Sequence, residues 1–119
     1  DVLGSRGLGD VYKRQAKKAG VKNFDKFHNA GYKGLYNGET ADDIAKRKGL
    51  RYREDILDNM GSTELIANLF RISQAEEKLK KDGVNTEKEA CKTHNKIGKI
   101  VRKAIKEAGR NYARRFTYS

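Results

Sequence analysis

The 119-residue sequence contains no proline, no tryptophan, one cysteine and one methionine, and it has no long apolar run. The single cysteine, Cys91, excludes an internal disulfide and is typical of proteins from the reducing cytoplasm. Because no run approaches the ~18 apolar residues of a membrane span, we expect no membrane partner. No signal-peptide pattern precedes the charged segments. These absences favour a cytoplasmic protein.

Charged residues make up 36% of the sequence, as much as the hydrophobic residues, and the formal net charge is +11. This composition suits helices with a solvated surface better than a sheet with two buried faces. No alternating apolar and polar pattern predicts a strand. We therefore expect an all-α fold, in which short helices and a glycine-rich loop precede an antiparallel pair of long amphipathic helices. The positive charge suggests an anionic partner.

Capping residues and glycines divide the first half of the chain. Asn23 is expected to cap a short helix, FDKFHNAG, which ends at Gly31. The next stretch, GYKGLYNGE, is predicted to be a turn-rich loop. Its expected anchors to the core are Tyr32, Leu35 and Tyr36. Thr40 and Asp43 resemble a capping box for a helix that Gly49 closes, and EDILDNMG predicts another short helix.

Two long amphipathic helices are predicted over residues 63–82 and 87–109. Ser62 or Thr63 is expected to cap the first, and a Schellman motif at Gly83 to end it; Thr86 and Glu89 form a capping box for the second. The expected stripe of the first is Leu65, Leu69, Ile72 and Leu79, widened by Ile66 and Phe70. That of the second is Ala90, His94, Ile97, Val101, Ile105 and Ala108. The short turn between the helices predicts an antiparallel hairpin.

Lysines recur at intervals of four, three, four and three along the second long helix, on the face opposite its apolar stripe. A row of lysines at this pitch can follow a phosphate backbone and release counterions on binding. The alternative is an ordinary solvated face, because lysine is a common surface residue. The candidate nucleic-acid-binding residues are Lys92, Lys96, Lys99, Arg102, Lys103 and Lys106.

Motifs for metal, phosphate or catalysis are weaker. Cys91 and His94 are three residues apart, but a zinc site recruits four ligands and the other histidine, His28, is distant. We expect His94 at the core edge with a polar partner, and no metal or other cofactor. In GYKGLYNGET, Glu39 stands where a phosphate loop has lysine, and its carboxylate would repel the ligand. No catalytic residues stand out, so we expect neither an enzyme nor a small-molecule substrate.

Residues 42–57 offer a helix-turn-helix hypothesis. Two short helices around a Gly-Leu turn can read duplex DNA. Ala45 and Gly49 are four residues apart, and Arg51 and Arg53 could contact phosphates. Gly49 serves equally well as a simple helix stop.

Three stretches carry a resemblance to a known family: FHNAGYKGLYNGET, ILDNMGSTELIANLFRISQAEEKLKKDGVN and THNKIGKIVRKAI. Over about Ala16 to Gly109, the sequence resembles the C-terminal half of the bacterial DNA damage-inducible protein D family. The resemblance implies a part in the SOS response, in which the family is thought to modulate recombinase filaments on single-stranded DNA without catalysis. It also implies a partner, the missing N-terminal domain, similar to that of baculovirus repeated-ORF proteins. His94 matches a family position and Cys91 does not.

Both ends depart from the family. The chain opens on Asp1, and residues 1–15 end in DVYKRQ, which is similar to translated sequencing adapter; we expect this segment to be a disordered artefact. Where the family continues GTMPEDLPTP, this chain reads RNYARRFTYS, and a one-base shift of permitted codons converts one into the other. Residues 110–119 are therefore expected to be a frameshifted tail, which leaves a helical module over residues 16–109. Without the ends, which contribute +1 and +3, the net charge is +7.

Three hypotheses of function follow. The leading one is a non-enzymatic DNA-damage-response module that acts at a recombinase filament on single-stranded DNA. The second is a helix-turn-helix regulator that reads duplex DNA through residues 42–57. The third is an interaction scaffold whose apolar faces bind the missing N-terminal domain, without nucleic-acid contact.

Overall fold

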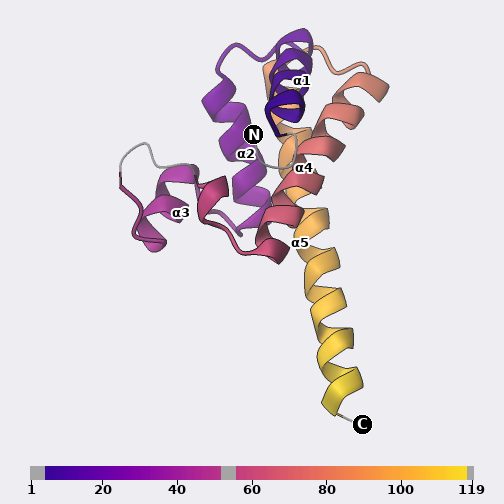
Figure 1. Ribbon diagram of the computed structural model, residues 1–119. Helices are drawn as coiled ribbons and strands as arrows, with labels where there is room; N and C mark the ends of the chain where they lie inside the picture. Colours follow the sequence, from indigo (N-terminus) through magenta and orange to yellow (C-terminus); the bar gives the residue numbers. More distant parts are fainter. Residues whose placement is uncertain (1–4, 52–55, 118–119) are drawn as a thin grey trace.

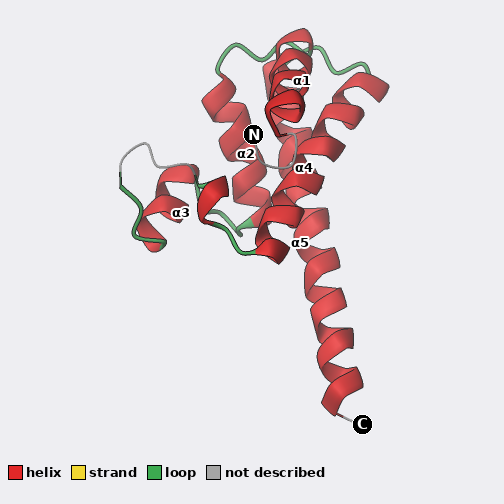
Figure 2. Cartoon of the chain, viewed as in Figure 1, coloured by secondary structure: helices red, strands yellow, loops and turns green. Residues whose placement is uncertain are grey.

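The computed structural model describes residues 5–51 and 56–117, and in this part of the chain it is helical without strands (Figure 2). The elements are α1 (Ser5–Lys18), α2 (Phe24–Leu35), α3 (Ala41–Arg47), the 3₁₀ turn η2 (Leu57–Asn59), α4 (Ser62–Lys81) and α5 (Glu87–Thr117). The predicted all-α class is confirmed. None of the described helices combines the length and the hydropathy that crossing a membrane requires.

Two helices pack against the first half of α5. Both α2 and α4 lie against α5, and α1 lies against α4 and α2 (Figure 1). The C-terminal part of α5 extends beyond the other helices (Figure 1). This arrangement explains the outcome for the predicted stripe of α5: Ala90, His94, Ile97 and Val101 are buried, whereas Ile105 and Ala108 are exposed.

Helix α2 does not end at Gly31, as the sequence predicted, but continues to Leu35. The expected loop GYKGLYNGE is therefore helical in its first half. Gly31 and Gly34 are buried against α5, where a Cβ on Gly34 would collide with the Asn95 carbonyl oxygen. These glycines allow close packing of two backbones and do not mark a turn. The predicted anchors hold: Tyr32 and Leu35 are buried, and Tyr36 is half-buried.

The buried face of α4 is more polar than the predicted stripe. It consists of Ala67, Asn68, Arg71, Ile72, Ala75 and Leu79. Leu65 and Leu69 are only half-buried, and Ile66 and Phe70 are 64% and 53% exposed. Ile66 and Phe70 were predicted to widen the packed stripe of α4, and this prediction is wrong. The face of α4 that packs in the core contains Asn68 and Arg71 instead. The predicted N-cap, Ser62 or Thr63, is also wrong. The N-cap of α4 is Gly61, which has no side chain to bond the first turn.

The other local signals predicted the helix ends well. The Asn23 side chain accepts a hydrogen bond from the Lys26 N–H, and Thr40 with Asp43 forms a full capping box. At the end of α4, the Val84 N–H donates to the Leu79 carbonyl at 3.2 Å, as in the predicted Schellman motif at Gly83. These contacts lie within a few residues of each other, so the sequence alone specifies them.

Residues 5–15 lie in α1, which differs from the disorder predicted for them. Tyr12 is 3% exposed and packs edge-on against Phe24, at 5.2 Å between ring centroids. Tyr12 thus packs α1 against α2, and α1 also lies against α4. The adapter origin of residues 1–15 and the frameshift after Gly109 remain predictions, which the source nucleotide read would test.

The helix-turn-helix hypothesis depends partly on residues 52–55, which include Arg53 and lie outside the described residues. Its first helix is α3, seven residues long, which Gly49 closes with φ +70°. The described part of the predicted second helix is the three-residue turn η2. Within the described residues, these positions show no helix long enough to lie in a major groove.

A core substitution tests the packing of α4. Leu79 is 2% exposed, and Leu79→Ala is expected to lower the free energy of unfolding by about 2–5 kcal/mol, because it leaves a cavity. Ile66→Ala on the exposed side of α4 should change it by less than about 0.5 kcal/mol. Urea denaturation followed by circular dichroism measures both, and equal losses in the two variants would contradict the observed face.

Candidate nucleic-acid interface

The basic face predicted on α5 lies on the solvent side of the helix. The opposite face is buried, through Ala90, His94, Ile97 and Val101. Five predicted residues are exposed and Arg102 is half-buried. The exposed residues are Lys92, Lys96, Lys99, Lys103 and Lys106. The structure therefore places the five lysines on one exposed face of α5, about one helical turn apart, with Arg102 beside them.

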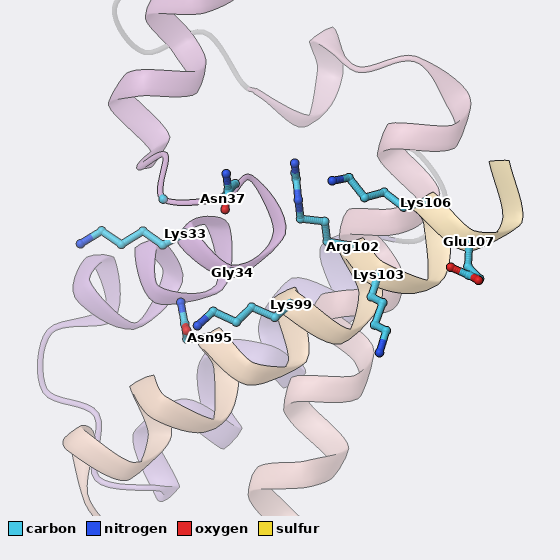
Figure 3. A pocket seen from close by; sticks show the side chains of 10 residues that line it. Lys33, Gly34, Asn37, Asn95, Lys99, Arg102, Lys103, Lys106 and Glu107 are labelled. Atoms are coloured by element: carbon cyan, nitrogen blue, oxygen red, sulfur yellow. The ribbon is translucent and has the colours of Figure 1, made fainter. Parts of the chain in front are cut away.

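A groove of about 680 Å³ lies between the end of α2 and the second half of this basic face (Figure 3). The α5 residues that line it are Asn95, Lys99, Arg102, Lys103, Lys106 and Glu107. The other side consists of Lys33, Gly34, Asn37 and Gly38. Lys92 and Lys96 do not line the groove. In Figure 3 the Lys99 side chain extends toward α2, whereas Lys103 points away from it.

Arg102 holds the end of α2 against α5. Its Nη1 donates to the carbonyl oxygen of Leu35 at 3.0 Å, and Asn95 Nδ2 donates to that of Ala30, also at 3.0 Å. The last carbonyls of a helix carry partial negative charge, so the guanidinium offsets a charge that would otherwise face the groove. Arg102 thus has a structural contact that the sequence prediction did not include.

A buried polar cluster lies on the other side of α5. Arg71 is fully buried; its Nη1 donates to His94 Nε2 at 2.6 Å, and its Nη2 donates to Asn68 Oδ1 at 3.1 Å. Its guanidinium also lies 4.7 Å from the centre of the Tyr32 ring, a stabilising cation–π contact. His94 Nδ1 donates to the Phe27 carbonyl oxygen at 3.0 Å, so the ring is the neutral Nδ1–H tautomer.

These contacts show where the candidate metal residues lie. His94 is in the core, not at its edge as predicted, and both of its nitrogens are engaged within the protein. Cys91 is half-buried, and burial raises the pKa of its thiol. Among the residues that the structure describes, no group of three or more histidine, cysteine or acidic side chains could hold a metal ion.

Burial sets the protonation of both histidines. Burial, and then the Arg71 charge, holds the pKa of His94 well below its usual value. The Tyr12 hydroxyl and His28 Nδ1 share a hydrogen bond of 2.8 Å. Burial, with the charges of Arg71 and Lys13, lowers the pKa of His28 to about 3. Both rings are therefore neutral at pH 7 and act as hydrogen-bonding parts of the core.

A second polar cluster ties α3 to α4. Glu64 accepts a hydrogen bond from the Tyr36 hydroxyl at 2.5 Å and another from Lys48 Nζ at 2.7 Å. Although burial acts to raise it, these two donors bring the pKa of the Glu64 carboxyl below its usual value. Asn68 Nδ2 donates to the Tyr36 hydroxyl at 3.0 Å. These polar groups bond to one another within the cluster, so its role is to hold α3 and α4 together.

Sequence reasoning missed Lys33 and Asn37 as neighbours of the basic face. It placed both in a loop, because Gly31 was interpreted as a helix end. A helix continued through Gly31 would have placed Lys33 on α2, and Asn95 is one turn before Lys99 on α5. Helical spacing could thus have placed Lys33 on α2, but no local signal indicated that α2 packs beside the basic face of α5.

Comparison with known proteins agrees with the sequence resemblance. The family model of the DinD C-terminal domain matches residues 9–115. DNA damage-inducible protein D of Escherichia coli (strain K12) is 52% identical over 96 residues, which cover 81% of this chain and 35% of that relative. This chain therefore spans about a third of the relative's length. No solved structure matches. The chain belongs to the DNA damage-inducible protein D family and contains its DinD C-terminal domain.

Proposed function

We propose that this chain is a non-enzymatic module of the cytoplasmic DNA-damage response that binds single-stranded DNA, within a recombinase filament, through the basic face of α5. The observation that carries the proposal is the separation of the two faces of one helix. The apolar face is buried against α2 and α4, while the opposite face holds five exposed lysines. The relative's name connects the family to DNA damage. Single-stranded DNA in a recombinase filament carries negative phosphates, which are complementary in charge to these lysines.

The chemistry of the face fits a phosphate backbone better than base edges. Lysine ammonium groups act as point charges that neutralise phosphates and release counterions, and they carry no sequence information. The face of α5 also lacks exposed aromatic side chains between Lys92 and Lys106 on which bases could stack. The proposed binding is therefore electrostatic, weak and tolerant of sequence.

Salt dependence tests the proposal. Lys96, Lys99 and Lys103 replaced together by Gln in the full chain should flatten the log–log slope of affinity against salt by up to about 2, because each single-strand phosphate contributes about 0.7. Helicity should be unchanged, since Gln is a comparable helix former. Fluorescence anisotropy with a labelled oligothymidylate measures the slope.

The matched control removes the same charge at the other end of the molecule. Lys18, Lys80 and Lys81 are exposed on α1 and α4, and their triple replacement by Gln should change the slope by less than about 0.7. An equal change in both triple variants would indicate an effect of net charge alone. Salt-independent or absent binding of the parent would favour the interaction scaffold instead.

A further inference from the structure

The basic face of α5 is not uniform along its length. Its second half borders the groove at the end of α2, whereas Lys92 and Lys96 lie earlier on α5 and do not line the groove. Around Lys99 to Lys106, the end of α2 therefore supplies the other wall of the groove. A ligand that follows α5 alone would contact all the lysines alike, but a ligand in the groove would contact Lys33 and not Lys92.

The groove has the composition of an anion site. Five of its lining residues are cations and one, Glu107, is a carboxylate. Asn37 and Asn95 add amide groups from the two walls, and few apolar side chains are present. Its volume, about 680 Å³, is within the range of sites that hold small ligands. An extended phosphodiester fits this composition, whereas an apolar ligand does not.

Both walls of the groove are fixed by contacts that need no ligand. Gly34, which lines the groove, and Gly98 bring α2 and α5 into backbone contact, with 3.1 Å from a Cβ at Gly34 to the Gly98 Cα. Arg102 binds the Leu35 carbonyl, and the Gly38 N–H donates to the Lys33 carbonyl at 2.7 Å. Asn37 takes a left-handed conformation with φ 55°, which completes this turn at the rim. A preformed groove loses little conformational entropy on binding.

We propose that this groove holds a phosphodiester of the bound single strand, so that the strand crosses α5 between Lys33 and Lys99–Lys106 instead of running along the whole helix. This inference rests on the proposed function and deepens it. In this arrangement, Lys33 of α2 contacts the strand directly and Lys92 does not.

Two single variants of the full chain separate the groove from the whole face. Lys33→Gln and Lys92→Gln remove one exposed helical lysine each, so they are matched in charge and in helix propensity. With oligothymidylate at low salt, Lys33→Gln should weaken binding several-fold and flatten the salt slope by about 0.7, and Lys92→Gln should change affinity less than twofold. Equal effects of the two variants, or a larger effect of Lys92→Gln, would overturn the groove while the proposed function stands.

Amide chemical shifts of the unmutated chain give a second readout. Gly34 and Gly38 line the groove, while Gly49 and Gly83 lie on other elements. Titration with oligothymidylate should shift the first pair and leave the second unchanged. If poly-glutamate shifts Gly34 and Gly38 and oligothymidylate does not, the nucleic-acid assignment is overturned in favour of an acidic protein segment. If oligothymidylate binds without shifting either groove glycine, the groove is wrong and α5 alone is the site.

Discussion

Gly98→Ala is expected to destabilise the fold by about 1–2 kcal/mol, although alanine is the better helix former. A Cβ at this position would lie 2.6 Å from the Gly31 carbonyl oxygen and 2.7 Å from the Leu35 backbone nitrogen. Both neighbours are backbone atoms of α2, so α2 must move as a whole for the methyl group to fit. Overpacking of this kind typically costs about 1–3 kcal/mol, and it outweighs the gain of up to about 1 kcal/mol in helix propensity.

Gly109→Ala is the matched control on the same helix. Nothing lies within 4 Å of a Cβ at Gly109, so only the propensity term applies, and the expected result is a gain of up to about 1 kcal/mol. Urea denaturation gives both free energies. A stabilising Gly98→Ala would mean that α2 and α5 do not touch as the structure describes.

The same crossing shows why part of the fold could be predicted and part could not. The caps at Asn23 and Thr40 and the end of α4 at Gly83 depend on contacts a few residues apart, and the sequence predicted them correctly. The continuation of α2 through Gly31 depends on α5, about 65 residues later in the chain, as the Asn95–Ala30 hydrogen bond shows. Local patterns contain no information on such a partner, and a glycine alone suggests a helix end as readily as a close contact.

The face of α4 was mispredicted for a related reason. Ile66 and Phe70 were predicted to be buried because they are hydrophobic, and nothing in the sequence pattern predicted that Asn68 or Arg71 would be buried. The buried position of Arg71 is acceptable only because His94, Asn68 and Tyr32 surround its guanidinium. These partners come from three helices, so no single stretch of sequence could reveal them.

The candidate site was predicted in its α5 half only. Lysine spacing on one helix is a local pattern, and the structure places those lysines on the solvent side as a helical wheel requires. The groove needs the end of α2 and the turn at Asn37, and both follow from the helix crossing at Gly34 and Gly98. The part of the site made by two elements is thus the part that local sequence patterns did not predict.

The free energy of unfolding is expected to fall by about 3 kcal/mol between pH 7.5 and pH 4.5 because of His28, and His94 lowers it further in the same direction. Folding holds the pKa of His28 at about 3 and that of His94 well below its ordinary value. In the unfolded chain both titrate near 6.5, so below that pH the unfolded state binds more protons than the folded state. The stabilisation is complete above pH 6.5 and is lost as the pH falls toward the folded pKa values.

The pH range separates the histidines from the carboxylates. Asp43, Glu64 and Glu87 also have lowered pKa values in the fold, but in the unfolded chain they titrate near 4, so their effect begins at about the lower end of this range. His28 should add a slope of about 1.4 kcal/mol per pH unit below 6.5, and His94 adds to it with the same sign. Urea denaturation at closely spaced pH values gives the slope, and His28→Gln should reduce it by about 1.4 kcal/mol per pH unit, whatever that variant does to stability at pH 7.5. A slope that is flat in the parent, or unchanged in His28→Gln, would show that His28 is accessible to protons in the folded protein and is not held neutral beside Tyr12.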